Sequence, residues 1–370
     1  MRIKAMLAAL AGLALCAGLG IVNPARAAQP DGGGPIVIKF SHVVAPDAPK
    51  GQAAERFRVL AEQMTGGRVR VEVYPNSQLY KDKEELEALQ LGAVQMLAPS
   101  LAKFSPLGVK EFEAFDLPYI FPTRAALYAV TEGPIGKSLL QKLEAKGITG
   151  LAYWDNGFKI MSANRPLHSP ADFRGLRMRI QGSKVLDVQM RALGATPHVL
   201  AFSEVVPALQ ARVVDGTENP PSNMLTQKMD EVQKYVTVSN HGYLGYAVIV
   251  NKKFWDGLPR DIREQLEQAL RDATVFEKQV AQHDNDAALD QIRKKGRSKV
   301  YVLTPQEQAE WRRALAPVQD QMAGRIGKDL IDAINRTTAK TAAQAGAQAG
   351  AQAAAQAAAQ AAVRAASASR

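Results

Sequence analysis

Hydrophobic and polar residues in the first part of the chain follow two periods, that of a strand and that of a helix. Val69, Val71 and Val73 alternate with polar residues, as in a half-buried strand. Residues 52–64 instead gather their apolar side chains on one helical face. The predicted elements in chain order are a strand at 36–40, a helix at 52–64, a strand at 69–73, a helix at 83–91 and a strand at 93–98. This alternation predicts an α/β fold with a parallel sheet.

The same alternation starts again near residue 150. The predicted elements here are strands at 150–154, 176–180 and 197–200, and helices at 183–193 and 203–211. Ser203 is a residue type that caps helices, so we expect it to cap the last of these. Two α/β units in succession predict two lobes with a cleft between them.

A helical pattern without internal proline or glycine runs over residues 259–295. One helix of this length would extend roughly 55 Å at about 1.5 Å per residue, which is enough to run along two lobes. The alternative is two helices that break near residues 283–285. Residues 341–370 are Gln-Ala-Gly-Ala and then Gln-Ala-Ala-Ala repeats, which favour a helix but offer no apolar face. We expect them to form a frayed, dispensable tail.

The N-terminus has the pattern of a secretory signal peptide. An apolar run at 6–22 follows two basic residues, and Ala25-Arg26-Ala27 has the small residues that signal peptidase requires. We expect cleavage after Ala27 or Ala28. A membrane anchor is the alternative, but the run is short and glycine-rich. The single cysteine, Cys16, lies within it, so the mature chain would have no disulfide. No later segment is apolar enough to span a bilayer.

Composition narrows the class of protein. The chain has 370 residues, 46% of them hydrophobic, and a net charge of +10, which indicates about two globular domains. The basic residues are scattered and aromatics are 6%, which argues against nucleic acid but is compatible with an anionic ligand. There is no H-E-x-x-H, G-x-S-x-G or cysteine nucleophile, and the five histidines lack metal-ligand spacing. Nothing in the sequence supports an enzyme or a cofactor.

Arg179 is the strongest candidate binding residue. It belongs to the strand predicted at 176–180, where Arg177 and Arg179 lie on the face opposite the apolar residues. It is near the carboxyl end of that strand, where open α/β sheets bind ligands, and the helix that Ser183 opens favours anions at its start. A guanidinium fork matches the two oxygens of a carboxylate. The alternative is a solvated arginine at a strand edge.

Several motifs in order resemble the solute-binding subunits of tripartite ATP-independent periplasmic (TRAP) transporters, the dicarboxylate-binding DctP type in particular. The resemblance covers about residues 35–335. Its motifs are Ile-Lys-Phe-Ser-His at 38–42, Tyr-Pro-Asn-Ser-Gln-Leu at 74–79, Phe-Asp-Leu-Pro-Tyr at 115–119, Asp-Phe-Arg-Gly-Leu-Arg-Met-Arg at 172–179, Phe-Ser-Glu-Val at 202–205 and Val-Asp-Gly-Thr-Glu-Asn-Pro at 214–220. Together they are highly specific, although none is specific alone.

The resemblance implies roles for particular residues. In this family the arginine that matches Arg179 pairs with the ligand carboxylate, the asparagine that matches Asn219 hydrogen-bonds the same region, and the aromatic that matches Phe202 packs on the ligand. Lys159 stands where the sialic-acid binders carry a second arginine, which resembles the dicarboxylate branch. The resemblance also places Glu218 and His241 in a buried polar network beneath Lys159.

The first lobe is expected to supply specificity. His42 and Lys50 flank the loop after the first strand, and Ser100 and Lys103 follow the strand that ends at Ala98. A second ligand carboxylate would need a cation here, which Lys50 or Lys103 could provide. The alternative is that all four are surface loop residues.

The resemblance implies a two-lobed periplasmic solute-binding fold with a hinge and a long helix that spans both lobes. We assign 1–28 to the signal peptide, 29–156 and about 245–284 to lobe I, 157–244 and about 285–336 to lobe II, and 337–370 to the Ala/Gln tail. The expected function is capture of a succinate-, malate- or fumarate-like dicarboxylate for the TRAP membrane subunits. The alternatives are another organic acid (a 2-oxo, aromatic or sugar acid) or, from another class, a periplasmic enzyme.

Overall fold

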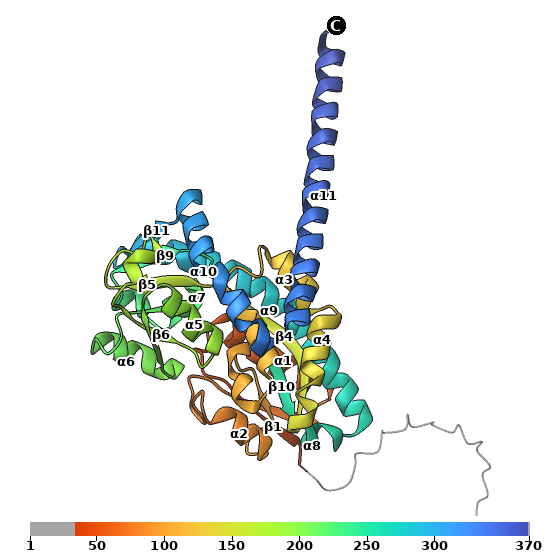
Figure 1. Ribbon diagram of the computed structural model, residues 1–370. Coiled ribbons are helices and arrows are strands. Elements are labelled where there is room, and N and C mark those ends of the chain that lie inside the picture. The colour runs from red at the N-terminus through yellow and green to blue at the C-terminus, as the bar shows by residue number, and fades with distance from the viewer. Residues whose placement is uncertain (1–33, 369–370) are drawn as a thin grey trace, which may run out of the picture. The chain divides into compact units, whose positions relative to one another are not determined.

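The computed structural model describes residues 34–368, and two mixed β-sheets organise them (Figure 1). The first sheet has the strand order β2-β1-β3-β10-β4 and the second β11-β9-β5-β8-β6-β7. Each sheet combines parallel strands with antiparallel ones, such as β10 in the first and β5 in the second. The α/β class is confirmed, but the sheets are mixed rather than purely parallel.

The first lobe is the first sheet with the helices packed on it. Its strands are β1 (Ile36–Ser41), β2 (Val69–Tyr74), β3 (Met96–Leu97), β4 (Ile148–Phe158) and β10 (Tyr243–Asn251). Its helices are α1 (Pro49–Met64), α2 (Glu85–Gln90), α3 (Arg124–Thr131), α4 (Pro134–Gln141), α8 (Lys252–Asp256) and the short 3₁₀ turns η1 (Leu101–Lys103), η2 (Ser105–Leu107), η3 (Lys110–Asp116) and η4 (Glu144–Lys146). The apolar face of α1 packs on the sheet through Phe57, which contacts Phe40 edge to face.

The second lobe is the second sheet with its helices. Its strands are β5 (Ile160–Ala163), β6 (Arg177–Ile180), β7 (Thr196–Val199), β8 (Gly216–Asn219), β9 (Tyr235–Val238) and β11 (Lys299–Val302). Its helices are α5 (Lys184–Ala192), α6 (Val205–Gln210), α7 (Pro221–Thr226), α10 (Pro305–Ile326) and the 3₁₀ turns η5 (Pro170–Phe173), η6 (Phe202–Glu204) and η7 (Met229–Glu231). β6 pairs in parallel with both β7 and β8, so the carboxyl ends of these three strands lie at one edge of the sheet.

Several boundaries differ from the sequence predictions, and three of them concern the site. The helix expected from residue 52 already begins at Pro49, a residue suited to a first helical position, so Lys50 lies in its first turn rather than in a loop. The strand expected over 93–98 is reduced to Met96–Leu97. The predicted cap at Ser203 is wrong: a 3₁₀ turn precedes α6, and the Glu204 side chain accepts from the amide of Ala201 at 2.9 Å.

The chain crosses between the sheets at two adjacent places. Lys159 alone separates β4 from β5, and the segment from Ser239 to Gly242 separates β9 from β10. The backbone N–H of Lys159 donates to the carbonyl of Gly242 at 2.9 Å, so the two crossings are tied together. Gly157 just before the first crossing has φ +105, and a β-carbon there would lie 2.8 Å from the Asn285 amide. Glycine thus allows the crossing to approach the long helix.

The long helix is continuous. α9 spans Arg260–Lys295, 36 residues, so the alternative of a break near 283–285 is wrong. It packs on α1 and β4 of the first lobe and on α7 of the second. In its second half, Asn285 donates to the carbonyl of Asn156 at 2.7 Å and accepts from the amide of Ser222 at 3.0 Å. One helix therefore supports both lobes.

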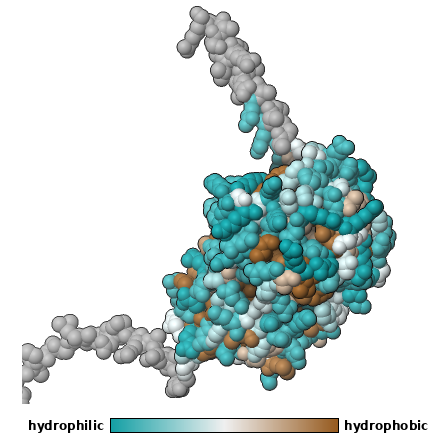
Figure 2. All heavy atoms as spheres, turned by 90° about the vertical axis from the view of Figure 1, so that its left-hand side faces the viewer, coloured by the Kyte–Doolittle hydropathy of each residue, from teal (hydrophilic) through white to brown (hydrophobic). Residues whose placement is uncertain are grey.

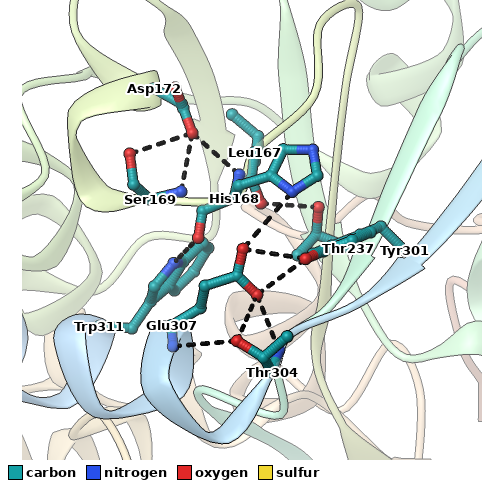
Figure 3. Close-up of polar contacts among 9 residues, drawn as sticks. All are labelled: Leu167, His168, Ser169, Asp172, Thr237, Tyr301, Thr304, Glu307 and Trp311. Atoms are coloured by element: carbon teal, nitrogen blue, oxygen red, sulfur yellow. Dashed lines mark hydrogen bonds and ion pairs between the residues drawn. The ribbon is translucent and has the colours of Figure 1, made fainter.

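α10 begins at a capping box that Figure 3 shows in detail. Glu307 accepts from the amide of Thr304 at 2.7 Å, while the Thr304 hydroxyl accepts from the amide of Glu307 at 3.3 Å. Tyr301 donates to the same carboxylate, and Trp311 donates to the carbonyl of His168 at 2.9 Å. These contacts fix the start of α10 on the second lobe.

The last helix, α11 (Lys328–Ala368), begins against the first lobe. Ile331 and Ile334 are buried, and the helix packs on α3. Figure 1 shows its later turns extending away from α3 and α4. The backbone of the Ala/Gln tail is helical to Ala368, as its repeats predict.

The surface seen in Figure 2 is mostly hydrophilic, with separate hydrophobic areas. The large apolar side chains that are exposed come from different elements, for example Leu91 after α2, Val199 in β7 and Val302 in β11. Scattered exposed apolar residues of this kind are ordinary. Within residues 34–368, no helix combines the length and hydropathy needed to cross a bilayer.

Candidate functional site

Arg179 lies at the carboxyl end of β6, and its side chain is buried. Its residue exposure is 2%, and its Nε and Nη2 donate to the carbonyl of Leu200 at 3.1 and 2.8 Å. Burial lowers the pKa of Arg179, and the charges of Asp82 and Glu218 oppose this. Arg177, two residues earlier, is exposed and pairs with Asp215 at 2.8 Å. The alternation predicted one face for both arginines, but only Arg179 is buried, whereas Arg177 forms a surface ion pair.

Glu218 in β8 is the centre of a buried polar network. Its Oε1 accepts from Lys159 Nζ at 2.6 Å, and its Oε2 lies 2.9 Å from His241 Nε2 and 3.1 Å from Gln189 Nε2. Ser239 Oγ lies 2.7 Å from the other ring nitrogen of His241. Burial alone would raise the pKa of Glu218, but Lys159 and His241 hold it well below its usual range. Lys159, Glu218 and His241 thus lie together, as the resemblance implied, at the crossings between the lobes.

Asn219 and Phe202 are both buried in the second lobe. Asn219 Nδ2 has only long contacts within the described residues, 3.4 Å to Thr217 Oγ1 and 3.7 Å to Met229 Sδ. Phe202 packs in an apolar cluster that also contains Val44 and Ala48 from the loop after β1. This loop of the first lobe therefore shares an apolar cluster with the second lobe.

The first-lobe side chains His42 and Lys50 are each 1% exposed, so neither is a surface loop residue. Lys50 Nζ donates to the carbonyl of Ala98 at 2.9 Å and lies 3.8 Å from the centre of the Tyr246 ring. Burial, and then the charge of Lys103, lower the pKa of Lys50 to about 7. Burial and the charge of Lys50 lower the pKa of His42 to about 3. An ammonium held by a carbonyl and a ring is well placed to gain an anionic partner.

Lys103 does not fit its expected role. It is buried, but it forms ion pairs with Asp82 and, at 2.5 Å, with Glu85. Burial alone would lower the pKa of Lys103, but these two carboxylates raise it. Of the two alternatives for the first-lobe cation, Lys50 or Lys103, Lys103 already has two carboxylate partners from the fold, which favours Lys50. Ser100 accepts from Gln181 Nε2 at 2.8 Å, a hydrogen bond from the second lobe to the first.

The fold also buries polar atoms that lack a hydrogen-bond partner within the described residues. They are both ring nitrogens of His42, which the sequence had indicated, and the side-chain polar atoms of Asn156 and the hydroxyl of Tyr246, which it had not. Buried polar atoms normally have partners, so these atoms are candidates for ligand contacts. A cavity of about 310 Å³ is lined from both lobes by residues that include Asp82, Lys103 and Arg179. No local motif marks Tyr246, whereas Asp82 follows the 74–79 motif closely.

Two further predictions concern metal ligands and the N-terminus. Within residues 34–368, no cluster of three or more potential metal ligands occurs. The predicted signal peptide at 1–28, which contains Cys16, lies outside the described residues. It remains a prediction from the sequence.

A buried guanidinium at the carboxyl edge of a parallel strand pair, beside a cavity lined from both lobes, is typical of a protein that binds an anionic solute. The chain belongs to the family described as bacterial extracellular solute-binding protein, family 7 (DctP), which matches residues 40–325. This family comprises solute-binding proteins rather than enzymes, so the predicted family and the prediction of a binding protein are confirmed.

Individual relatives are similar over most of their length. The chain is 66% identical over 306 residues to the C4-dicarboxylate-binding periplasmic protein DctP of Rhodobacter capsulatus, covering 83% of this chain and 92% of that protein. A solved TRAP solute-binding protein of Shewanella oneidensis, with bound succinate, has a TM-score of 0.81 and 41% identity over 82% of this chain and 99% of that one. Another from Pseudomonas aeruginosa, with bound L-malate, has a TM-score of 0.76 and 44% identity over 78% and 100%.

Proposed function

We propose that this protein captures a small dicarboxylate, such as succinate, malate or fumarate, in the periplasm and delivers it to TRAP membrane subunits. One observation carries the proposal. Of the four buried cations in the described residues, Lys103 and Lys159 have carboxylate partners, whereas Lys50 and Arg179 have none in ion-pair contact. Lys50 comes from the first lobe and Arg179 from the second.

The charge balance favours a ligand with two anionic groups. An unpaired buried charge is costly, so closing the lobes on Lys50 and Arg179 favours a ligand that brings an anion to each. Such a ligand bridges the lobes and binds the closed state better than the open one. The relatives that bind succinate, malate or C4-dicarboxylates support this ligand class.

The proposed roles follow from the chemistry of the groups. Arg179 binds one carboxylate through its fork, Asn219 donates its amide beside it, and Phe202 packs on the ligand carbons. Lys50 pairs with the second carboxylate, and His42 lies next to it. Five further residues support the site without pairing with a ligand carboxylate: Ser100, Lys103, Lys159, Glu218 and His241.

Delivery and localisation are part of the same proposal. The predicted signal peptide and the extracellular family support export to the periplasm. The TRAP membrane subunits would then accept the closed, loaded protein. Uptake of labelled succinate into vesicles that contain those subunits should require this protein.

A calorimetric screen of organic acids tests the ligand class. Succinate, malate or fumarate should bind in the micromolar range or tighter, and butyrate or lactate at least tenfold more weakly, since each offers only one carboxylate. 2-Oxo, aromatic and sugar acids belong in the same screen. Equal binding of monocarboxylates and dicarboxylates would show that Lys50 does not contact the ligand. Turnover of a bound acid would favour an enzyme instead.

A further inference from the structure

Asp82 connects the two lobes through a single carboxylate. It lies between β2 and α2 in the first lobe, and its side chain is 14% exposed. One oxygen forms the ion pair with Lys103, and the other accepts from the backbone N–H of Phe202 at the start of η6 in the second lobe. Opening the lobes would break the second of these contacts but not the first.

The charge of Asp82 is maintained by its surroundings. Burial alone would raise its pKa, but Lys103, the amide of Phe202 and the charge of Arg179 lower it to about 2. The carboxylate is therefore ionised at neutral pH, and its bond to the Phe202 amide is charge-assisted, a class stronger than a neutral hydrogen bond.

The burial of this contact distinguishes it from the exposed ion pair beside it. Lys81 and Glu204 approach across the same gap, but their nitrogen and oxygen are 3.7 Å apart and both side chains are about half exposed. Exposed pairs of this kind contribute little. Asp82 instead lines the cavity shared with Arg179, and it holds the backbone of Phe202, the aromatic residue assigned to the ligand.

We propose that Asp82 is a positioning residue that holds the closed lobes together at Phe202 and so prolongs the residence of the bound ligand. This rests on the proposed function, because the ligand it retains is the carboxylate bound by Arg179. Asp82 also keeps Lys103 directed toward its own lobe, which leaves Lys50 as the first-lobe cation for the ligand. Glu85 remains as a partner of Lys103 when Asp82 is replaced, so the variants should fold.

Rapid-mixing measurements of succinate binding by the full mature chain test the role. In Asp82→Ala the dissociation rate constant should rise about tenfold or more, because the closed state loses a charge-assisted bond, while the association rate constant stays within about threefold. Asp82→Asn, which retains an acceptor oxygen, should fall between Asp82→Ala and wild type. The matched control Lys81→Gln removes the exposed pair across the same gap and should release succinate within twofold of the wild-type rate.

The outcomes separate the two proposals. A wild-type dissociation rate in Asp82→Ala, or an equal loss in Lys81→Gln, would overturn the role of Asp82. A change confined to the association rate would overturn it as well. If wild type binds no dicarboxylate, the proposed ligand class fails instead, and the same rate comparison with the acid that the screen identifies still decides the role of Asp82.

Discussion

Lys159 and Lys50 are both 1% exposed, but their surroundings differ. Lys159, at a crossing between the lobes, pairs with Glu218, which His241 and Gln189 also contact. Lys50 in the first lobe contacts a carbonyl and an aromatic ring. Lys159 has a carboxylate partner within the fold, whereas Lys50 has none in ion-pair contact among the described residues, which is why we propose Lys50 as the cation that receives the ligand. Burial alone therefore does not define the role of a lysine, because the groups that contact its ammonium decide it.

The largest expected effect tests this difference with one substitution at two positions. Lys159→Met should destabilise the protein by about 3–5 kcal/mol, because it leaves Glu218 buried without its cation. Lys50→Met should be neutral or stabilising in the ligand-free protein, because it removes a buried ammonium that has no carboxylate in ion-pair contact in the described chain. Urea denaturation measures both. Equal losses at the two positions would break the comparison.

The Glu218 network also predicts an acid dependence. The pKa of Glu218 is held below its ordinary value of 4.5, so its contribution to stability is present above that value and lost as the pH falls below it. Lys159→Met should weaken this loss on acidification, and Lys50→Met should leave it unchanged.

The next effect concerns ligand affinity in the second lobe. Arg179→Lys should weaken carboxylate binding by about 2–4 kcal/mol, because a lysine cannot reproduce the fork. The matched control is Arg177→Lys, two residues away on β6 but exposed and paired with Asp215, and its affinity should match wild type. Calorimetry decides it: affinity within twofold of wild type in Arg179→Lys would remove Arg179 from the site.

The contrast between these residues also shows what the sequence was able to predict. Arg179 was found because the alternation of residues and the position at a strand end are local features. The role of Lys159 was predicted only from the family resemblance, because no local pattern marks the crossing on which it lies. The long helix was predicted because its pattern is continuous, whereas the Ser203 cap failed because a 3₁₀ turn intervenes before α6.

Partners that are distant in sequence were not predictable from local patterns. The sequence left Lys50 and Lys103 as equal candidates for the first-lobe cation, but folding brings Asp82 and Glu85 to Lys103. Tyr246, which covers Lys50, comes from β10, almost two hundred residues along the chain. Charge counting along a sequence therefore overestimates the number of cations available to a ligand, because tertiary contacts neutralise some of them.

A smaller effect is the pH dependence of binding through Lys50. Its pKa in the ligand-free protein is lowered from 10.5 to about 7, and a bound carboxylate should raise it again. Succinate affinity should therefore fall above about pH 7, by up to tenfold per pH unit, since binding then requires proton uptake. Lys50→Met should flatten this dependence, and Lys252→Gln, at a partly exposed lysine of the same lobe, should not. Calorimetry in buffers of different ionisation enthalpy measures the proton uptake directly.

The same group has the opposite effect on the stability of the ligand-free protein. Between about pH 7 and 10.5 the unfolded chain binds the Lys50 proton more strongly than the folded chain. Its contribution to stability therefore rises with pH over this window, while affinity falls. Parallel changes in stability and affinity would contradict the assignment of Lys50 as the receiving cation.

The smallest effect is expected from the C-terminal tail, which belongs to neither buried cluster. Ile331 and Ile334 anchor the start of α11, and Thr338 is the last residue recorded as buried among the described side chains. Deletion of residues 341–370 removes an Ala- and Gln-rich segment that begins after these anchors, so it should change neither the melting temperature nor succinate affinity. Truncation before Ile331 is the contrasting variant, because it removes two buried isoleucines and should cost about 2–5 kcal/mol. A melting temperature lowered by more than about 5 °C in the shorter deletion would show that the tail stabilises the lobes.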